Sequence, residues 1–413
     1  MTRKVWILLI VASLGYFVDI YDLILFNIVK KDSILSLGFD EDAIRELEIV
    51  LFNYQMFGMM IGGLLWGVLG DRRGRVMVLF GSILLYSLAN IANAFIVDIE
   101  QYKILRLLAG IGLAGELGAG VTLISETMEK NKRGIGTMVI VTFGAMGAVF
   151  AVMVGNHGHI INDMMGWHFL NWQIAYIIGG VMGFVLLFIR TQNMESELFK
   201  KAKTDTDIQK GNFFQFFKTP DMAMTYLSCF AIGVPIWYMV GILCALADRF
   251  SEANSQIRVS IPTCIMWTYI GLSVGDLLSG FLSQWAQSRK KVIYGYLVFS
   301  AICGLTFLFT KNQSENFYYT LTFLMGASTG YWGLFVMNTT EQFGTNLRST
   351  ASSTIPNFVR ATIIPISLSF KCLSEDIGVV LSASLVGTFC FFIAFVGNIL
   401  IKDGFNRNLD YQQ

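Results

Sequence analysis

Among the charged side chains inside long apolar stretches of the sequence, five suggest chemistry: Asp19, Asp22, Arg106, Glu116 and Arg360. A charge in apolar surroundings is costly unless it is paired or used, so each is a candidate functional group. Carboxyl groups near an arginine can bind and release a proton when their surroundings change. An arginine can also hold a carboxylate or phosphate through two parallel hydrogen bonds. These residue types predict proton exchange and anion binding.

The spacing of the first four residues suggests how they could meet. Asp19 and Asp22 are three residues apart and share one helical face. Arg106 and Glu116 are ten apart, which rotates them by about 80° relative to each other. If both helices face one cavity, Asp22 could pair with Arg106 and carry the proton, with Asp19 as second choice. The alternative is a permanent structural salt bridge. Glu116 could be a second proton site or pack against Arg106.

Arg360 lies between Pro356 and Pro365, which can loosen a helix locally. An arginine facing a cavity there could bind a carboxylate or phosphate, which predicts an anionic or zwitterionic solute. The alternative is an ion pair with Asp276. Other polar and aromatic residues near the middle of apolar stretches could line the same pocket: Tyr54, Gln55, Trp237, Tyr238, Tyr331, Trp332, Asn338 and Asn357.

The elements that must position these residues are membrane-spanning helices. Of the 413 residues, 54% are hydrophobic and only 14% are charged, whereas soluble domains contain about 25% charged residues. Apolar stretches of about 20 residues follow one another and are long enough to cross a bilayer. They are continuously apolar rather than alternating, which favours helices over a β-barrel. The predicted fold is an all-α integral membrane protein with the lipid bilayer as its surroundings.

The apolar stretches predict twelve spans: 5–29, 47–69, 76–97, 101–126, 135–160, 171–190, 222–247, 258–285, 291–310, 317–340, 350–372 and 378–401. The polar, lysine-rich segment 191–221 divides them six and six. We therefore expect an N-terminal six-helix bundle in residues 1–190, a central loop in 191–221 and a C-terminal bundle in 222–413. The first stretch is too long for the core of a signal peptide and is read as a retained span.

Loop charges predict the orientation. Basic residues cluster in alternate loops, at 3–4, 72–75, 130–133, the central loop, 289–291 and near 402–407. The positive-inside rule then places both termini and the central loop in the cytoplasm. The short outer loops favour a bacterial cytoplasmic (inner) membrane.

The two halves contain matching sequence patterns. Gly58, Gly62 and Gly67 recur at the same spacing as Gly271, Gly275 and Gly280. Such small residues let helices pack closely in lipid. Duplicated halves are typical of secondary transporters, whose solute site lies between the halves near the bilayer midplane.

Charges at the predicted cytoplasmic helix ends could form gates. The loop GVLGDRRGR (67–75) places Asp71 beside Arg72, Arg75 and a tight turn at Gly74. A glutamate and an arginine seven residues apart follow both the fourth and the tenth span: Glu126 with Arg133, and Glu341 with Arg348. These groups could form ion pairs that break as the halves move, or they could be simple interface charges.

Several of these motifs resemble the major facilitator superfamily. GVLGDRRGR resembles its signature loop, and Arg106 in RLLAGIG resembles its arginine of span 4. YFVDIYDLILF (16–26), GLAGELGAG (112–120) and ETMEKNKRG (126–134) are similar to the metabolite:proton symporters, while MESELF (194–199) and EQFGTNLRST (341–350) are also similar to loops of sugar porters. The resemblance independently implies Asp22 as the proton carboxyl. The chain departs at Gly344, where those families usually have proline, and it lacks the glutamine-rich span 7 of sugar porters.

Together these features predict a secondary active transporter, a proton-coupled importer of a small anionic or zwitterionic metabolite that works by alternating access. A facilitative uniporter, or an exporter of a polar metabolite or carboxylate chelator on the same fold, is the alternative. Catalytic motifs, a P-loop and metal-binding spacings of Cys and His are missing from the sequence, so we expect no enzyme activity, cofactor or metal. The near-neutral net charge implies no nucleic-acid partner, and we expect a monomer.

Overall fold

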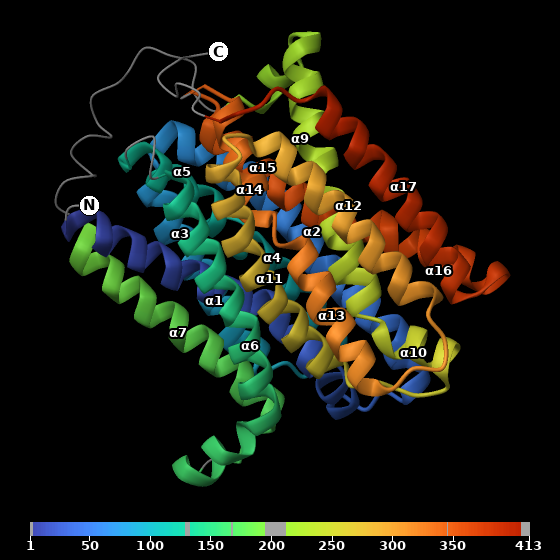
Figure 1. Cartoon of the computed structure of the whole chain (residues 1–413). Helices are drawn as coiled ribbons and strands as arrows, with labels where there is room; N and C mark the ends of the chain where they lie inside the picture. Colours follow the sequence, from blue (N-terminus) through green and yellow to red (C-terminus); the bar gives the residue numbers. More distant parts are fainter. Residues whose placement is uncertain (1–2, 129–132, 167, 195–211, 345, 406–413) are drawn as a thin grey trace.

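A computed structural model of the chain describes residues 3–128, 133–166, 168–194, 212–344 and 346–405. This part of the chain is a bundle of helices without strands, as the sequence predicts (Figure 1). The first described residues of the chain and the end of its last helix lie at the same end of the bundle, uppermost in Figure 1. We call this the terminal end and the opposite one the distal end.

The N-terminal half, residues 3–194, contains seven described helices. They are α1 (Arg3–Ser36), α2 (Glu41–Arg73), α3 (Arg75–Asn93), α4 (Ile99–Leu113), α5 (Glu116–Thr127), α6 (Arg133–Met165) and α7 (Asn171–Met194). The turn between α2 and α3 is made by Gly74, whose positive φ of 96° is a conformation that favours glycine.

The C-terminal half, residues 212–405, begins with the short 3₁₀ helix η2 (Phe213–Phe217). It continues with α9 (Pro220–Tyr238), the π-helical turn η3 (Met239–Cys244), α10 (Ala247–Ser255), α11 (Ile261–Trp285), α12 (Arg289–Phe309), α13 (Glu315–Thr329), α14 (Trp332–Gln342), α15 (Arg348–Ala361), α16 (Ile363–Ile377) and α17 (Val379–Leu400). The separate helix α10, at the distal end, was not predicted from the sequence.

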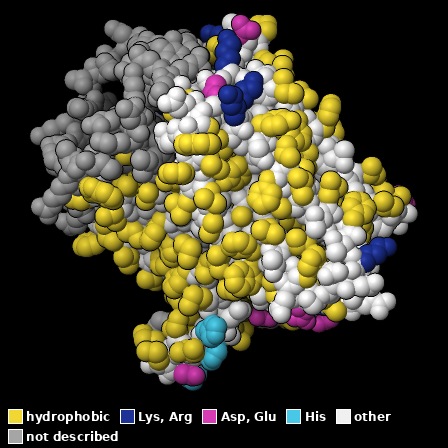
Figure 2. Space-filling view, in the orientation of Figure 1, with side chains coloured by type: hydrophobic (Ala, Val, Ile, Leu, Met, Phe, Trp, Pro, Cys, Tyr) yellow, Lys and Arg dark blue, Asp and Glu magenta, His cyan; other side chains and the backbone are white. Residues whose placement is uncertain are grey.

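Ten helical segments of the described chain are long and apolar enough to cross a membrane. The predicted spans 317–340 and 350–372 are not among these ten. Each of them consists of two shorter helices, α13 with α14 and α15 with α16. The surface between the two ends is predominantly apolar, and charged and histidine side chains gather toward the ends (Figure 2). This distribution is that of a multi-pass membrane protein.

Spans 4 and 10 break at the same level in the two halves. α4 ends at Leu113 and α5 begins at Glu116, while α13 ends at Thr329 and α14 begins at Trp332. The glycine patterns explain the packing beside each break. The backbones of Gly58 and Gly62 lie against α4, and those of Gly271 and Gly275 lie against α13, so close that a Cβ would clash. The expected role of these glycines in close helix packing is confirmed.

The two halves meet tightly at the terminal end, where α15 packs against α2 and α5. Asp71 accepts hydrogen bonds from the backbone N–H groups of Ser349 (3.1 Å) and Thr350 (2.8 Å) and from the Thr350 hydroxyl (2.6 Å). A carboxylate at the first turn of a helix also favours its dipole. The signature-loop aspartate therefore caps a helix of the other half and helps to close this end.

Further contacts continue the closure toward the middle of the bundle. Thr122 and Ser352 share a hydrogen bond of 2.7 Å, and Asn357 donates to the Ala114 carbonyl over 2.9 Å. At the edge of this region, Glu341 pairs with Arg289 at 3.4 Å, a partner that was not predicted, and Arg348 is buried. Arg72 is exposed beside Asp71. The side chains of Arg75, Glu126 and Arg133 lie outside the described set.

We predict that Asp71→Asn opens the terminal end more often. Charge-assisted hydrogen bonds contribute about 1.5–3 kcal/mol, so their loss should raise the open population roughly 10-fold or more. The test is the rate at which a thiol reagent modifies Ser352→Cys, placed in a Cys372→Ser background because Cys372 is the exposed cysteine. An unchanged rate would show that Asp71 does not hold the two halves together.

Candidate functional site

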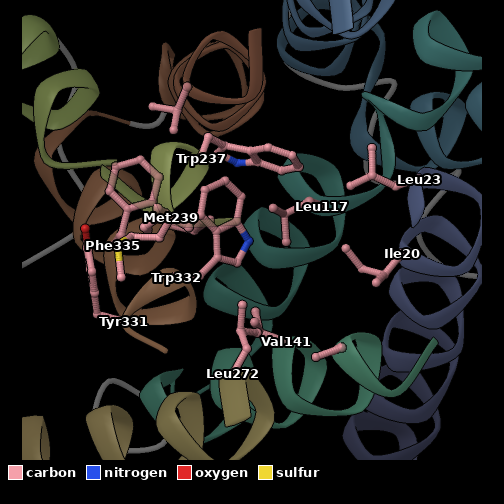
Figure 3. Close-up of a cluster of buried hydrophobic side chains, with 14 of the residues drawn as sticks. Ile20, Leu23, Leu117, Val141, Trp237, Met239, Leu272, Tyr331, Trp332 and Phe335 are labelled. Carbon is pink, nitrogen blue, oxygen red and sulfur yellow. The ribbon is translucent and has the colours of Figure 1, made fainter. Parts of the chain in front are cut away.

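A small cavity of about 30 Å³ lies between the two halves near mid-depth. It is lined by Tyr16, Ile20, Val141, Ala145, Ile236, Trp237, Val240, Tyr269, Leu272, Trp332 and Arg360. Figure 3 shows Trp237 and Trp332 of the C-terminal half facing Ile20, Leu117 and Val141 of the N-terminal half. The wall is therefore apolar and aromatic, with few polar groups, as is usual for small-molecule sites.

Arg360, on α15, is the charged group of this wall. Its Nη2 lies 3.7 Å from Asp19 Oδ2 and 3.4 Å from the Tyr16 hydroxyl, both on α1 in the other half. Its Nη1 donates to Asn357 Oδ1 over 3.2 Å, and its guanidinium lies over the Trp332 ring at 5.4 Å. An arginine that stacks on an aromatic ring and forks toward oxygen atoms suits recognition of a carboxylate.

Tyr16 connects the two halves through a second contact. Its hydroxyl accepts hydrogen bonds from Arg360 and from Trp332 Nε1, the latter over 2.9 Å. A phenolic oxygen that accepts twice still has its own O–H to donate. Tyr16 borders the cavity, so it can present a donor beside the guanidinium. The sequence analysis did not single out Tyr16, although it lies one turn before Asp19 on the same face.

Asp19 and Asp22 are both buried, with 0% and 1% of their surface exposed. Asp19 pairs with Arg360, so the alternative ion pair of Arg360 with Asp276 is not formed. Asp276 instead accepts a hydrogen bond from the Gly333 backbone over 2.9 Å, at the start of α14. Neither Asp22 oxygen has a hydrogen-bond partner among the described residues.

Arg106 does not form the ion pair predicted with Asp22. Its Nη2 donates to Gln55 Oε1, its Nη1 donates to the Tyr176 hydroxyl over 3.5 Å, and its guanidinium lies 5.0 Å from the centre of the Phe26 ring. Neutral oxygen atoms and aromatic rings therefore surround this buried cation, because α2 and α7 supply polar groups that the sequence pattern did not connect with α4.

Glu116 meets a different arginine from the one expected. It forms two parallel hydrogen bonds with Arg190 of α7, at 2.8 and 2.9 Å, and accepts another from Ser82 over 3.2 Å. Both members of the pair are buried within the N-terminal half. Arg190 was overlooked because it stands at the end of a predicted span, where an arginine usually reaches water.

The remaining predicted pocket residues occupy several environments. Trp237 and Trp332 line the cavity, and Asn357 supports Arg360. Tyr54 is 39% exposed on the outer face of α2, because it is rotated by about 100° from the neighbouring Gln55. Tyr238 and Tyr331 donate to backbone carbonyls of Ala383 and Ile232 within their own half, away from the cavity. Asn338 is buried beside Gln342 near the terminal end.

A larger pocket of about 670 Å³ lies at the distal end, next to the cavity. The residues that line the two pockets are neighbours. Gly241 and Ile363 line the larger pocket, next to Val240 and one turn beyond Arg360, which line the cavity. We call this pocket the distal vestibule. Ion pairs join the halves across its rim: Glu48 with Arg249 at 3.4 Å and Glu46 with Lys371 at 3.7 Å. The space between the halves is thus wide at the distal end and closed at the terminal end.

We predict that Glu116→Gln lowers stability, since removing one partner of a buried pair costs about 3–5 kcal/mol. Thermal unfolding in detergent should show a clear fall in Tm. The double variant Glu116→Leu, Arg190→Met is the control, because a well-packed apolar pair often replaces a buried ion pair without loss. A Tm unchanged in Glu116→Gln, with a loss of coupled transport, would instead point to a proton site.

Comparison with known proteins agrees with this architecture. The chain is 26% identical over 359 residues to the putative niacin/nicotinamide transporter NiaP of Bacillus subtilis, covering 86% of this chain and 84% of that protein. It is 25% identical to the sialic acid transporter NanX of Escherichia coli (84% and 82% covered) and 26% identical to the cis,cis-muconate transport protein of Acinetobacter baylyi (88% and 86% covered). The profile of the Major Facilitator Superfamily matches residues 12–366, and the chain belongs to this superfamily of solute transporters.

Proposed function

We propose that this transporter imports a small carboxylate-bearing metabolite together with a proton, by alternating access across a bacterial cytoplasmic membrane. The observation that carries the proposal is the contact between Asp19 and Arg360, which joins the two halves in the wall of the central cavity. A proton and an anion can each break this contact.

The solute site of the proposal consists of Arg360, Tyr16 and the aromatic wall. Arg360 would bind the carboxylate, the Tyr16 O–H would donate to it, and Trp237 and Trp332 would cover the rest of the molecule. The names of the three relatives support this chemistry, because niacin, sialic acid and muconate all carry a carboxyl group. The cavity of about 30 Å³ is smaller than any of these molecules, so binding would require Asp19 and Arg360 to separate.

Proton coupling follows from competition for Arg360. Ionised Asp19 occupies the guanidinium and repels a second carboxylate, whereas neutral Asp19 leaves Arg360 free to bind the solute. A proton and the anion would therefore bind together. Asp22 lies one helical turn away from Asp19, has no hydrogen-bond partner among the described residues and would exchange the proton with it. Two carboxyl groups so close titrate as a pair rather than independently.

The closed terminal end and the open distal vestibule define the state of the cycle. If the positive-inside rule places the terminal end in the cytoplasm, this state is open to the outside. A solute would enter through the vestibule, and separation of Asp71 from α15 would release it inward. The same geometry supports a uniporter or exporter if no proton moves with the solute.

The class of solute and the coupling can be measured together. Reconstituted vesicles carrying an internal pH dye would be exposed in turn to nicotinate, benzoate, muconate, sialic acid, nicotinamide and a sugar. We expect acidification with the carboxylates and not with nicotinamide or the sugar. Solute entry without a pH change would favour the uniporter, and acidification with nicotinamide would contradict the role given to Arg360.

We predict that Arg360→Lys weakens binding of the transported carboxylate while the protein stays folded. Lysine keeps the charge but loses the fork and the stack on Trp332, so a loss of about 1.5–3 kcal/mol should raise Kd roughly 10- to 100-fold. The exposed arginine Arg258, replaced by lysine, is the matched control. An unchanged Kd would remove Arg360 from the solute site.

We predict that Asp19→Asn separates solute binding from protons. In the wild type, raising the pH ionises Asp19, which then competes for Arg360, so solute affinity should fall as pH rises. The asparagine variant is always neutral and should bind with an affinity that does not depend on pH, while solute-driven acidification is lost. Binding that kept its full pH dependence would move the coupling to another group, with Asp22→Asn as the next variant to test.

A further inference from the structure

A chain of hydroxyl groups runs through the N-terminal half, apart from the cavity. Ser33 on α1 lies 3.1 Å from the Tyr102 hydroxyl on α4, which lies 2.7 Å from the Tyr176 hydroxyl on α7. All three residues are 0% exposed. Arg106 is bonded to Tyr176 at the inner end of this chain, which we call the hydroxyl chain.

Only one set of directions satisfies every contact in the hydroxyl chain at once. Ser33 donates its proton to the Lys30 carbonyl over 3.0 Å, so the bond from Tyr102 to Ser33 must be donated by Tyr102. Tyr102 has then used its proton, and Tyr176 must donate to it. Tyr176 accepts in turn from Arg106, which has no lone pair to offer. All the hydroxyl protons therefore point toward the distal end.

The two ends of the chain lie at the distal vestibule and beside Asp22. Lys30, which accepts from Ser33, lines the vestibule. At the inner end, Tyr176 stands one helical turn before Gly179, and Asp22 Oδ1 lies so close to Gly179 that a Cβ there would clash with it. Asp22 thus packs against α7 one turn from the last hydroxyl.

We propose that the hydroxyl chain conducts protons between the distal vestibule and Asp22, on a route separate from that of the solute. This inference rests on the proton coupling proposed above. For each proton conducted, a proton from the vestibule binds the Ser33 oxygen. The Ser33 proton then moves to the Tyr102 oxygen and the Tyr102 proton moves to the Tyr176 oxygen. The Tyr176 proton leaves for Asp22. After such a transfer every hydroxyl proton points back toward the vestibule, which is the arrangement that satisfies all the contacts of this state. Tyr176 and Asp22 are not hydrogen-bonded in this state, so they must approach for the last step.

The surroundings of Asp22 suit a proton acceptor at the end of this route. Charged and titratable groups interact with it from four helices: Asp19 and Tyr21 of α1, Tyr86 of α3, Arg106 of α4 and Tyr176 of α7. Glu116 of α5 is held in its own pair with Arg190. Arg106 interacts with Asp22 through its charge and donates a hydrogen bond to Tyr176, the last hydroxyl of the chain.

The test compares Tyr102→Phe with wild type in two transport modes. The first is proton-driven uptake of the transported carboxylate, with internal acidification read at the same time. The second is exchange of labelled for unlabelled solute at equal pH, which needs no net proton movement. We expect uptake and acidification to slow about 100-fold, the low end of what a positioned proton-transfer group contributes. Exchange and solute Kd should stay close to wild type.

Tyr318→Phe is the matched control, because Tyr318 is also fully buried and its hydroxyl contacts a serine, Ser255, in the other half. Ser33→Ala is a second, smaller change in the chain and should slow uptake in the same way. Wild-type uptake in Tyr102→Phe, or an equal loss of exchange and uptake, would overturn the proposed proton route. Wild-type protein that moves solute without protons would overturn the coupling itself, which is a different result.

Discussion

The ion pair between Asp19 and Arg360 is the interaction on which the arrangement of the two halves depends. It lies at the wall of the central cavity, where α1 of one half meets α15 of the other, and both side chains are almost completely buried. A buried charge that loses its partner is strongly destabilising. In the proposed mechanism, separation of the halves here is accompanied by another anion for Arg360 and a proton for Asp19. Because neither Asp19 nor Arg360 can be left buried as an unpaired charge, the proposed mechanism links movement of the halves to binding of the solute anion and the proton.

The contacts at the two ends differ, and they leave the Asp19–Arg360 pair more accessible from the distal end than from the terminal end. At the terminal end, Asp71 caps α15, the same helix that carries Arg360. Movement of α15 away from α2 would therefore disturb the cap and the central ion pair together. At the distal end the halves are joined by partly exposed ion pairs on the vestibule rim, such as Glu46 with Lys371. Exposed pairs contribute little, so this side can close or open at small cost.

The sequence predicted the helical membrane fold, the glycine-mediated packing and the presence of charges within the helical bundle, because these depend on composition and local spacing. It failed where partners are set by tertiary geometry. Arg106 was expected beside Asp22 but is bonded to Gln55 and Tyr176, and Arg360 meets Asp19, a partner that was not predicted. Helical periodicity determines which face a residue occupies on its own helix. It does not determine which of several neighbouring helices that face will meet.

The two buried carboxylate–arginine pairs show how the same chemistry can stabilise in one place and switch in another. Glu116 and Arg190 belong to one half, bond through two short parallel contacts and receive a third bond from Ser82. Asp19 and Arg360 belong to different halves, and their closest described contact is 3.7 Å. A pair within one rigid half keeps its geometry whatever the halves do. In the proposed mechanism, the looser pair between the halves exchanges its partners for a proton and an anion. Location, rather than residue type, then separates a structural ion pair from a coupling one.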